Sequence, residues 1–389
     1  IPIDATTVTS ELKNQGILKE VGGVEYLTEI FDLVPTASNV DQYIKIVEEA
    51  AMRRRLISVS KEITDSAYDK SNDTNTTLDD AERKILSVVK NRRSTEFRGI
   101  KEVLQSTKEN LEKLSMQKGE VTGLPTGWER LDKITAGLHE GALIIIAARP
   151  AMGKSAWALN LATNAAINSG KTVAIFNLEM SAESLASRMI ASVGHVEGYK
   201  LATGNLENDW DNVNEALSKL ENTNLYMDDT AGITIGEIRS KCRRLANSEK
   251  GLDLVIIDYL QLIDSSSRYS GSRQQEVSEI SRALKTMALE LEVPVIALSQ
   301  LSRSVEKRED KKPVLSDLRE SGSIEQDADI VAALHAPDVE VPVGDEVPNP
   351  IQLIILKHRN GPTKTIDLLF KKKTSTFLSI KRESDSSGK

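Results

Sequence analysis

The sequence predicts an α/β protein, with a central, mostly parallel sheet flanked by helices, that is preceded by a partial all-α domain. Three observations indicate this. Residues 1–95 place apolar residues three and four apart, the period of amphipathic helices. From about residue 121, short all-apolar segments alternate with helical ones, as in parallel sheets covered on both faces. One apolar segment runs into "ARPAMGKS" (148–155), which matches most of a phosphate-binding-loop pattern.

The composition limits the class of protein. At 389 residues the chain predicts two domains and a linker. No apolar run approaches the roughly 20 residues of a membrane helix, so no membrane partner is expected. The single cysteine, Cys242, excludes an internal disulfide and a cysteine zinc site and fits a reducing cytoplasm. The net charge of −8 argues against a generally basic surface but allows a local basic loop. The opening "IPIDATT" does not read as a signal peptide and indicates a shortened or processed chain.

The amino-terminal part is expected to pack or to oligomerise. Gly22-Gly23 and residues 35–38 interrupt its helices. The polar stretch 69–77 joins two long helices into a helical hairpin, with Thr77 placed to cap the second. We expect domains at 1–95 (partial helical domain), 96–120 (linker), 121–382 (the α/β domain with the phosphate-binding-loop pattern) and 383–389 (polar tail). The linker contains an amphipathic helix over 100–119, which must bury its apolar stripe on its own domain or on a neighbouring subunit; the stripe is Ile100, Val103, Leu104, Leu111 and Leu114.

The α/β part alternates strands and helices in a regular order. The expected strands and helices follow one another as 141–148, 154–170, 171–180, 233–251, 252–263, 274–292 and 293–300. Further strands are expected at 328–336, 351–359, 364–370 and 376–382. No helical segments separate the last strands, and "RNGP" (359–362) carries an Asn-Gly turn signal. The sheet should therefore end in an antiparallel hairpin.

The loop at 148–155 predicts a site for ATP and Mg²⁺. A strand, a loop and a helix that begins near Gly153 aim backbone N–H groups at an anion. Lys154 is expected at the β- and γ-phosphates and the Ser155 hydroxyl on Mg²⁺. Ala148 replaces the first glycine of the pattern, at a strand exit that need not adopt positive φ, and Pro150 stiffens the loop. The expected nucleotide-binding residues are Arg149, Pro150, Ala151, Met152, Gly153, Lys154, Ser155 and Ala156.

Polar residues at three other strand ends extend this site. Asp258 follows an apolar strand, where ligands gather in open α/β sheets, and is expected to anchor the metal. Glu179 follows another strand and could orient the attacking water, and Gln300 ends a third and could sense the γ-phosphate. The non-functional alternatives are that Asp258 caps a turn and that Glu179 is a solvated surface residue.

Two basic elements remain. Lys357 and Arg359, two residues apart, lie on the same side of a strand before a tight turn and could reach a neighbour's nucleotide as an arginine finger. The alternative is an ordinary charged hairpin face. In "DLRESGSIEQDAD" (317–329), Arg319 and the backbone near Gly322 could contact the phosphates of a nucleic-acid strand.

Together these motifs resemble the DnaB-type replicative DNA helicases, which are hexameric motors with a RecA-like fold. The matching segments are "TGLPTGWERLD" (122–132), "LIIIAARPAMGKSAWALN" (143–160), "FNLEMS" (176–181), "LVIIDYLQLI" (254–263), "ALSQLSR" (297–303), "DLRESGSIEQDAD" (317–329) and "KHRNGP" (357–362). "VGGVEYL", "PTASNVDQY" and "RRRLI" resemble the later part of that family's helical domain, so the resemblance implies that the start of that domain is missing. Members of that family also carry Ala-Arg-Pro at the positions of 148–150, in place of the first glycine of the general pattern.

The resemblance implies a role for each matching residue. Glu179 matches the catalytic glutamate, Gln300 the γ-phosphate sensor, and Lys357 and Arg359 the fingers that act in trans. Arg319, Glu320 and Gly322 match a loop that contacts the backbone of single-stranded DNA, and the stripe at 100–114 matches a linker helix that docks on the next subunit. It also implies a homohexamer in the cytoplasm of a bacterial or phage-infected cell, translocation 5′→3′ with strand exclusion, and a primase and a helicase loader as partners. The alternatives are a recombinase-like DNA-dependent ATPase without unwinding and a scaffold that binds ATP only as a switch.

Overall fold

The computed structural model describes residues 5–33, 40–69, 99–116, 121–264, 273–318, 322–337 and 347–380, with scattered positions between 74 and 88. The chain divides into two compact units, Ile1–Leu104 and Gln105–Lys389. None of the helices in these described segments combines the length and the apolarity needed to cross a membrane.

The first unit is helical. Its helices are α1 (Ala5–Asn14), α2 (Gly23–Leu33) and α3 (Val40–Tyr68). Gly22 and Gly23 both have positive φ at the start of α2, at the predicted break. The second helix of the predicted hairpin lies largely outside the described residues, although Lys84 Nζ pairs with a Glu62 carboxylate oxygen of α3 at 3.3 Å.

The helix α5 (Ile100–Met116) carries the predicted apolar stripe. Three of the stripe's side chains remain largely exposed: Ile100 at 71%, Leu104 at 59% and Leu111 at 61%. No other part of the described chain therefore buries these three apolar side chains.

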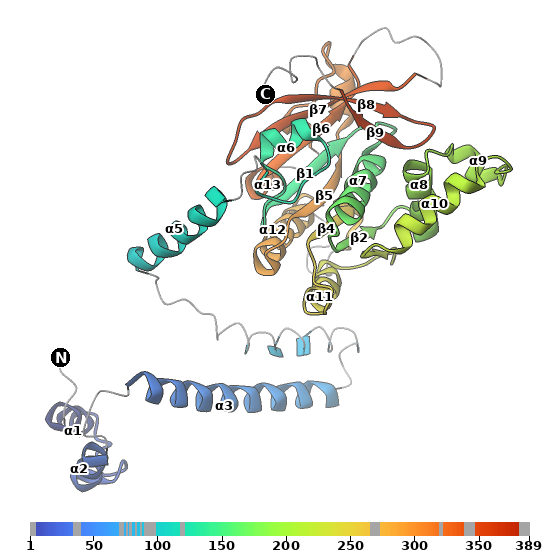
Figure 1. Ribbon diagram of the computed structural model, residues 1–389. Helices are drawn as coiled ribbons and strands as arrows, with labels where there is room; N and C mark the ends of the chain where they lie inside the picture. Colours follow the sequence, from blue (N-terminus) through green and yellow to red (C-terminus); the bar gives the residue numbers. More distant parts are fainter. Residues whose placement is uncertain are drawn as a thin grey trace. The chain divides into compact units, whose positions relative to one another are not determined.

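The second unit is built on a nine-stranded sheet in the order β3-β2-β4-β5-β1-β6-β7-β8-β9 (Figure 1). The strands are β1 (Leu143–Ala148), β2 (Val173–Asn177), β3 (Leu225–Asp228), β4 (Leu254–Asp258), β5 (Val295–Gln300), β6 (Ile330–His335), β7 (Asn349–His358), β8 (Thr365–Lys371) and β9 (Thr376–Ser379). Neighbours from β3 to β6 are parallel, and those from β6 to β9 are antiparallel. This confirms the predicted parallel sheet that ends in an antiparallel hairpin.

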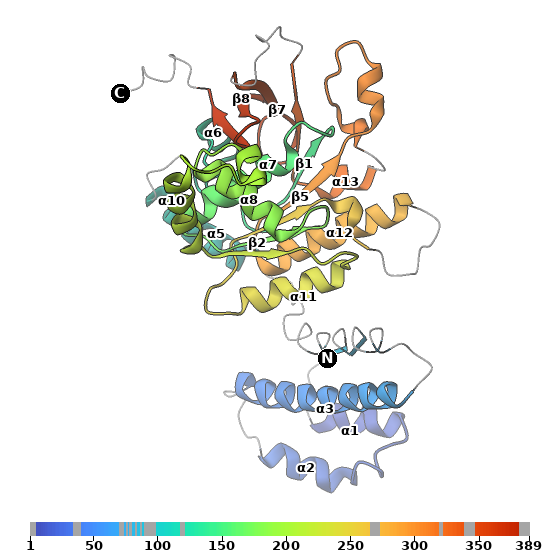
Figure 2. The ribbon, with the colours of Figure 1, turned by 90° about the vertical axis from the view of Figure 1, so that its right-hand side faces the viewer.

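Helices cover both faces of this sheet (Figure 2). They are α6 (Glu129–Thr135), α7 (Lys154–Thr163), α8 (Ala182–Val193), α9 (Gly198–Thr203), α10 (Trp210–Glu221), α11 (Ile235–Ala246), α12 (Arg273–Leu291) and α13 (Gly322–Asp327). Along β1, Ile144 and Ile146 join the core beneath α7 and α8, whereas Ile145 joins the core beneath α11 and α12. Successive β1 residues face opposite sides of the sheet, and both sides are covered, so every β1 side chain is buried.

Three elements differ from the sequence prediction. The strand expected over 252–263 ends at Asp258, because the chain then turns back and the Leu262 N–H donates to the Tyr259 carbonyl at 2.9 Å. The helix after the phosphate loop widens into a π-helical turn over Asn164–Asn168, where the Asn164 side chain donates to the Thr126 carbonyl. The segment 182–228, for which the sequence pattern predicts no element, forms α8, α9, α10 and β3.

Candidate nucleotide site

The predicted polar residues meet because four neighbouring strands are parallel. The ends of β1 and β5 are paired through Ala148 and Gln300, and the ends of β2 and β4 through Asn177 and Asp258. The carboxyl ends of these strands therefore share one edge of the sheet.

A cleft of about 450 Å³ opens at this edge. Its lining residues are Ala148, Arg149, Pro150, Ala151, Gly153, Lys154, Ser155, Ala156, Glu179, Met180, Arg188, Tyr259, Gln300, Phe370, Lys372 and Ser375. Met152 is the exception among the predicted nucleotide-binding residues, because its side chain packs against the core instead.

The phosphate loop adopts positive φ after its first position rather than at it. Ala148 is the last residue of β1 and has strand conformation, as expected. Positive φ occurs at Ala151 (67°) and Gly153 (83°). Gly153 precedes α7 without a side-chain cap, so the backbone N–H groups of the first helical turn are left for an anion.

Gly153 is also held against an aromatic pair. A Cβ built at Gly153 would lie 3.0 Å from Phe370 and 3.1 Å from Phe377. These two rings, from β8 and β9, stack with centroids 4.4 Å apart. The antiparallel end of the sheet thus supports the loop from beneath.

Lys154, which lines the cleft, forms an ion pair with the buried carboxylate of Asp258. Lys154 Nζ lies 3.1 Å from Asp258 Oδ1, and the two side chains are 13% and 4% exposed. The ammonium also lies 4.2 Å from the centroid of the Tyr259 ring, a cation–π distance. Burial raises the pKa of Tyr259, and the Glu179 and Asp258 carboxylates add to the rise, so its hydroxyl stays neutral.

The donors present fit a magnesium ion. The Ser155 hydroxyl lines the cleft, and Asp258 supplies a buried carboxylate that pairs with Lys154. Magnesium prefers such hard oxygen ligands and usually combines one or two carboxylates with substrate phosphates.

Asn177 shapes the turn that presents Glu179. Its side-chain oxygen accepts from the backbone N–H groups of Glu179 at 2.9 Å and of Met180 at 2.8 Å. Asn177 is 2% exposed, whereas Glu179 reaches the cleft. A buried amide thus fixes the backbone of a carboxylate that lines the cleft.

Sequence reasoning missed five polar or aromatic residues of the cleft: Arg188, Tyr259, Phe370, Lys372 and Ser375. The lysine run 371–373 directly after a strand is a signal that could have found Lys372. Arg188 lies within α8, and no local pattern marks it.

Lys357 and Arg359 lie at the opposite ends of the strands, near the starts of β6 and β1. Lys357 pairs with Val331 near the start of β6, and Ile330 pairs with Ile144 near the start of β1. The phosphate loop follows Ala148, the last residue of β1. Ala148 is five residues after Leu143, so the two ends of β1 lie about 17 Å apart at ~3.3 Å per residue. These two cations therefore do not line the cleft of their own chain.

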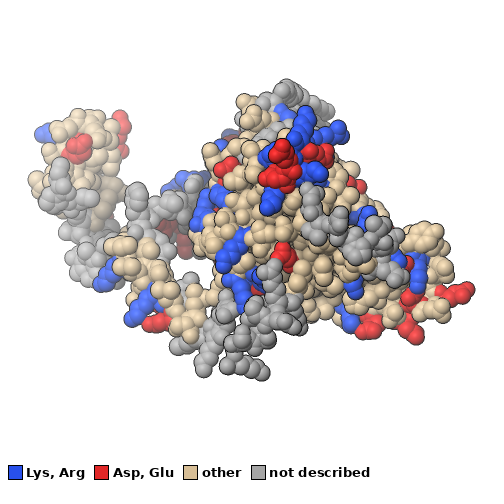
Figure 3. Space-filling view, turned by 90° about the horizontal axis from the view of Figure 1, so that it is seen from above, with Lys and Arg blue, Asp and Glu red and all other residues tan. Residues whose placement is uncertain are grey.

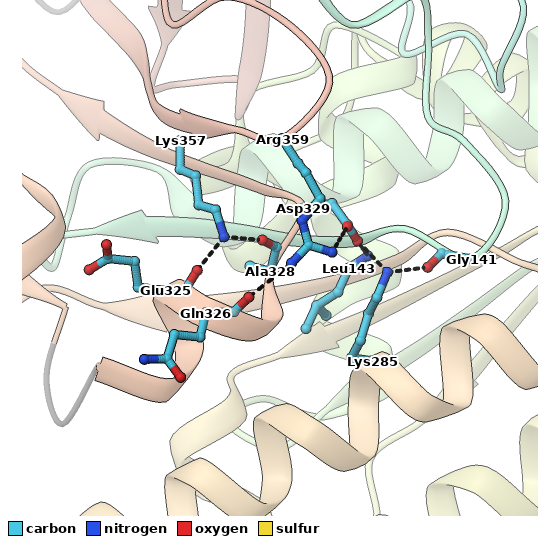
Figure 4. Close-up of polar contacts among 9 residues, drawn as sticks. All are labelled: Gly141, Leu143, Lys285, Glu325, Gln326, Ala328, Asp329, Lys357 and Arg359. Carbon is cyan, nitrogen blue, oxygen red and sulfur yellow. Dashed lines mark hydrogen bonds and ion pairs between the residues drawn. The ribbon is translucent and has the colours of Figure 1, made fainter.

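Both cations reach the junction of α13 and β6 (Figure 4). Lys357 Nζ donates to the carbonyls of Glu325 and Ala328. The Arg359 guanidinium contacts Asp329 Oδ1 at 3.0 Å. Burial lowers the pKa of Lys357, and the positive charge of Arg359 lowers it further.

The predicted DNA-contacting residues are only partly described. Arg319 and Glu320 lie outside the described residues, whereas Gly322 begins α13 and has open space where a Cβ would be. On the face that Figure 3 shows, lysine and arginine are interspersed with aspartate and glutamate in the second unit. This agrees with the expectation that the surface is not generally basic.

Two family descriptions match the chain: "DnaB-like helicase C terminal domain" over residues 123–379 and "DnaB-like helicase N terminal domain" over residues 1–49. The replicative DNA helicase DnaC of Bacillus subtilis (strain 168) is 50% identical over 388 residues, which is 100% of this chain and 85% of that protein. The replicative DNA helicase DnaB of Geobacillus stearothermophilus is 50% identical over 385 residues, 99% of this chain and 84% of that protein.

Solved structures give the same result. A DnaB-like replicative helicase, described with its interactions with primase, is 34% identical with a TM-score of 0.75 and covers 97% of this chain and 88% of that one. A second solved structure, described as an ATPase domain, is 39% identical with a TM-score of 0.68 and covers 74% of this chain and all of that one.

Proposed function

We infer that this chain, which belongs to the DnaB-like family of replicative DNA helicases, couples ATP hydrolysis in the cleft at the end of β1 to the unwinding of DNA. It is a replicative DNA helicase and an ATP-hydrolysing enzyme, as its curated relatives are. The recombinase-like alternative is no better supported by the matches.

The phosphate loop is proposed to bind ATP. The N–H groups at the start of α7 point toward the phosphates, and Lys154 exchanges its Asp258 partner for the β- and γ-phosphates. Asp258, which becomes free of Lys154 in this exchange, and the Ser155 hydroxyl would hold Mg²⁺. That ion supplies electrostatic stabilisation of the phosphoryl charge.

Hydrolysis is assigned to the two other strand ends. Glu179, held by Asn177, orients the attacking water and accepts its proton. Gln300 donates a hydrogen bond to the γ-phosphate and so distinguishes ATP from ADP.

The position of Lys357 and Arg359 carries the proposal that the site is shared between subunits. They lie at the sheet edge opposite their own cleft, and Arg359 is 48% exposed. A cation stabilises the negative charge on the transferred phosphoryl group only when it lies within a few ångströms of it. Arg359 therefore serves the cleft of the next subunit, with Lys357 beside it.

The remaining partners follow from family membership. We propose a homohexameric ring that holds single-stranded DNA through Arg319, Glu320 and Gly322, moves 5′→3′ and excludes the second strand. A primase is the proposed partner by analogy with the solved relative, and a helicase loader by the family resemblance. The cytoplasm is the proposed location.

A subunit-mixing experiment tests the shared site. Lys154→Ala inactivates a cleft but keeps an intact finger, and Arg359→Ala does the reverse. Each variant alone is expected to lose ATP hydrolysis, and a mixture is expected to regain it, because about one interface in four then joins an intact cleft to an intact finger. If the mixture stays as inactive as its components, the shared site is wrong.

A further inference from the structure

Asp329 holds Arg359 at two points. Its carbonyl accepts from the Arg359 backbone N–H at 2.8 Å, and its Oδ1 accepts from the guanidinium at 3.0 Å. The Asp329 side chain is 15% exposed, whereas about half of the Arg359 side chain remains accessible. A single residue thus restrains both ends of an arginine that faces solvent.

The other carboxylate oxygen of Asp329 is fixed to the frame of the sheet. Oδ2 accepts from the Leu143 N–H at 2.8 Å and from Lys285 Nζ at 2.6 Å. Leu143 begins β1 and is fully buried, and Lys285 of α12 also donates to the Gly141 carbonyl at 2.9 Å. The Asp329 carboxylate is therefore held by groups from β1 and α12, two elements that pack in the same core.

The carbonyl oxygens at the end of α13 complete the arrangement (Figure 4). Carbonyls in the last turn of a helix lack partners within the helix and attract cations. Lys357 donates to the Glu325 carbonyl in this turn and to that of Ala328, which directly follows the helix, and Arg359 Nη2 donates to that of Gln326 at 3.1 Å. We name the finger seat as the Asp329 carboxylate together with the carbonyls of Glu325, Gln326 and Ala328.

We propose that Asp329 is a positioning residue for Arg359 and sets the direction in which this finger is presented to the neighbouring subunit. A free arginine side chain loses rotamer entropy when it is immobilised. The finger seat removes much of that loss before the subunits meet, which is preorganisation. Asp329 itself does not touch the nucleotide. The inference rests on the proposed function, since it requires that Arg359 acts in trans.

The test uses Asp329→Asn and Asp329→Ser in the full chain, assembled and checked by native mass. Either variant that assembles decides the result. Alone, each is expected to lower kcat for ATP about tenfold or more, because the finger loses its orientation. KM for ATP is expected to change little, because the chain's own phosphate loop lies at the opposite edge of the sheet.

Mixing with Lys154→Ala separates positioning from a general structural defect. An Asp329 variant has an intact cleft, so a neighbouring Lys154→Ala subunit supplies it with a well-held finger and restores hydrolysis. A structural defect within the Asp329 variant would not be restored. Glu290→Gln is the matched control: Glu290 is 23% exposed and pairs with Arg239 and Arg243 of α11, and its loss is expected to leave kcat near the original value.

The outcomes distinguish the two proposals. If Arg359→Ala is complemented by Lys154→Ala but the Asp329 variants keep full kcat or are not complemented, Asp329 does not position the finger. If Arg359→Ala is not complemented either, the shared site itself fails, and this inference fails with it.

Discussion

Replacing Gly153 with alanine should weaken nucleotide binding by a predictable amount. The new Cβ would lie 3.0 Å from Phe370 and 3.1 Å from Phe377, and φ is +83°. Left-handed backbone costs an alanine about 1–2 kcal/mol, and overpacking against the stacked rings adds roughly 1–3 kcal/mol. The loop relieves this strain by shifting, and phosphate binding must reverse the shift. The expected loss of about 2–5 kcal/mol corresponds to a Kd raised roughly 30- to 4,000-fold.

Titration with a fluorescent ATP analogue measures this effect. Gly170→Ala is the matched control, since Gly170 also has positive φ, +62°, but nothing lies within 4 Å of the added Cβ. It carries the backbone strain without the contact and lies outside the cleft, so its Kd should stay at the original value. A Gly153→Ala chain that binds within about threefold of the original would refute the role of the aromatic support.

Three further predictions concern single side chains. Glu179→Gln should lower kcat by about 100-fold or more and leave nucleotide binding intact, as measured by steady-state hydrolysis beside the same titration. Burial raises the pKa of Cys242 to about 12, so the thiolate is scarce near neutral pH and a thiol reagent should label the protein only after denaturation. Because the pKa of Lys357 is lowered, its charge is lost at a lower pH than an ordinary lysine's. In Lys357→Arg, the loss of ATPase activity on the alkaline side of the pH profile should therefore occur at a higher pH.

The residues at the strand ends could be predicted because their placement follows from local sequence. An apolar run that ends in Asp258 or Gln300 predicts a buried strand with a polar end. Parallel pairing then brings such ends to one edge without further information. The phosphate loop added the missing link between them, since it follows β1 directly.

The finger seat could not be predicted, because it depends on contacts between distant parts of the chain. Lys285 and Asp329 are 44 residues apart, and Arg359 lies a further 30 along the chain. Arg188 reaches the cleft only because of where α8 packs. For Met152, the sequence pattern carried no sign that the side chain turns into the core.

The separation of the cleft and the proposed finger within one sheet has a consequence for how the proposed ring would be loaded. In that ring each subunit would offer a cleft at the carboxyl end of β1 and a finger near its amino end. A closed ring would then complete as many sites as it has subunits, whereas an open one would leave one cleft without a finger. A ring that opens at one interface to admit a DNA strand disables the site at that gap. Closure would restore it, so full hydrolysis would report that the proposed ring is closed.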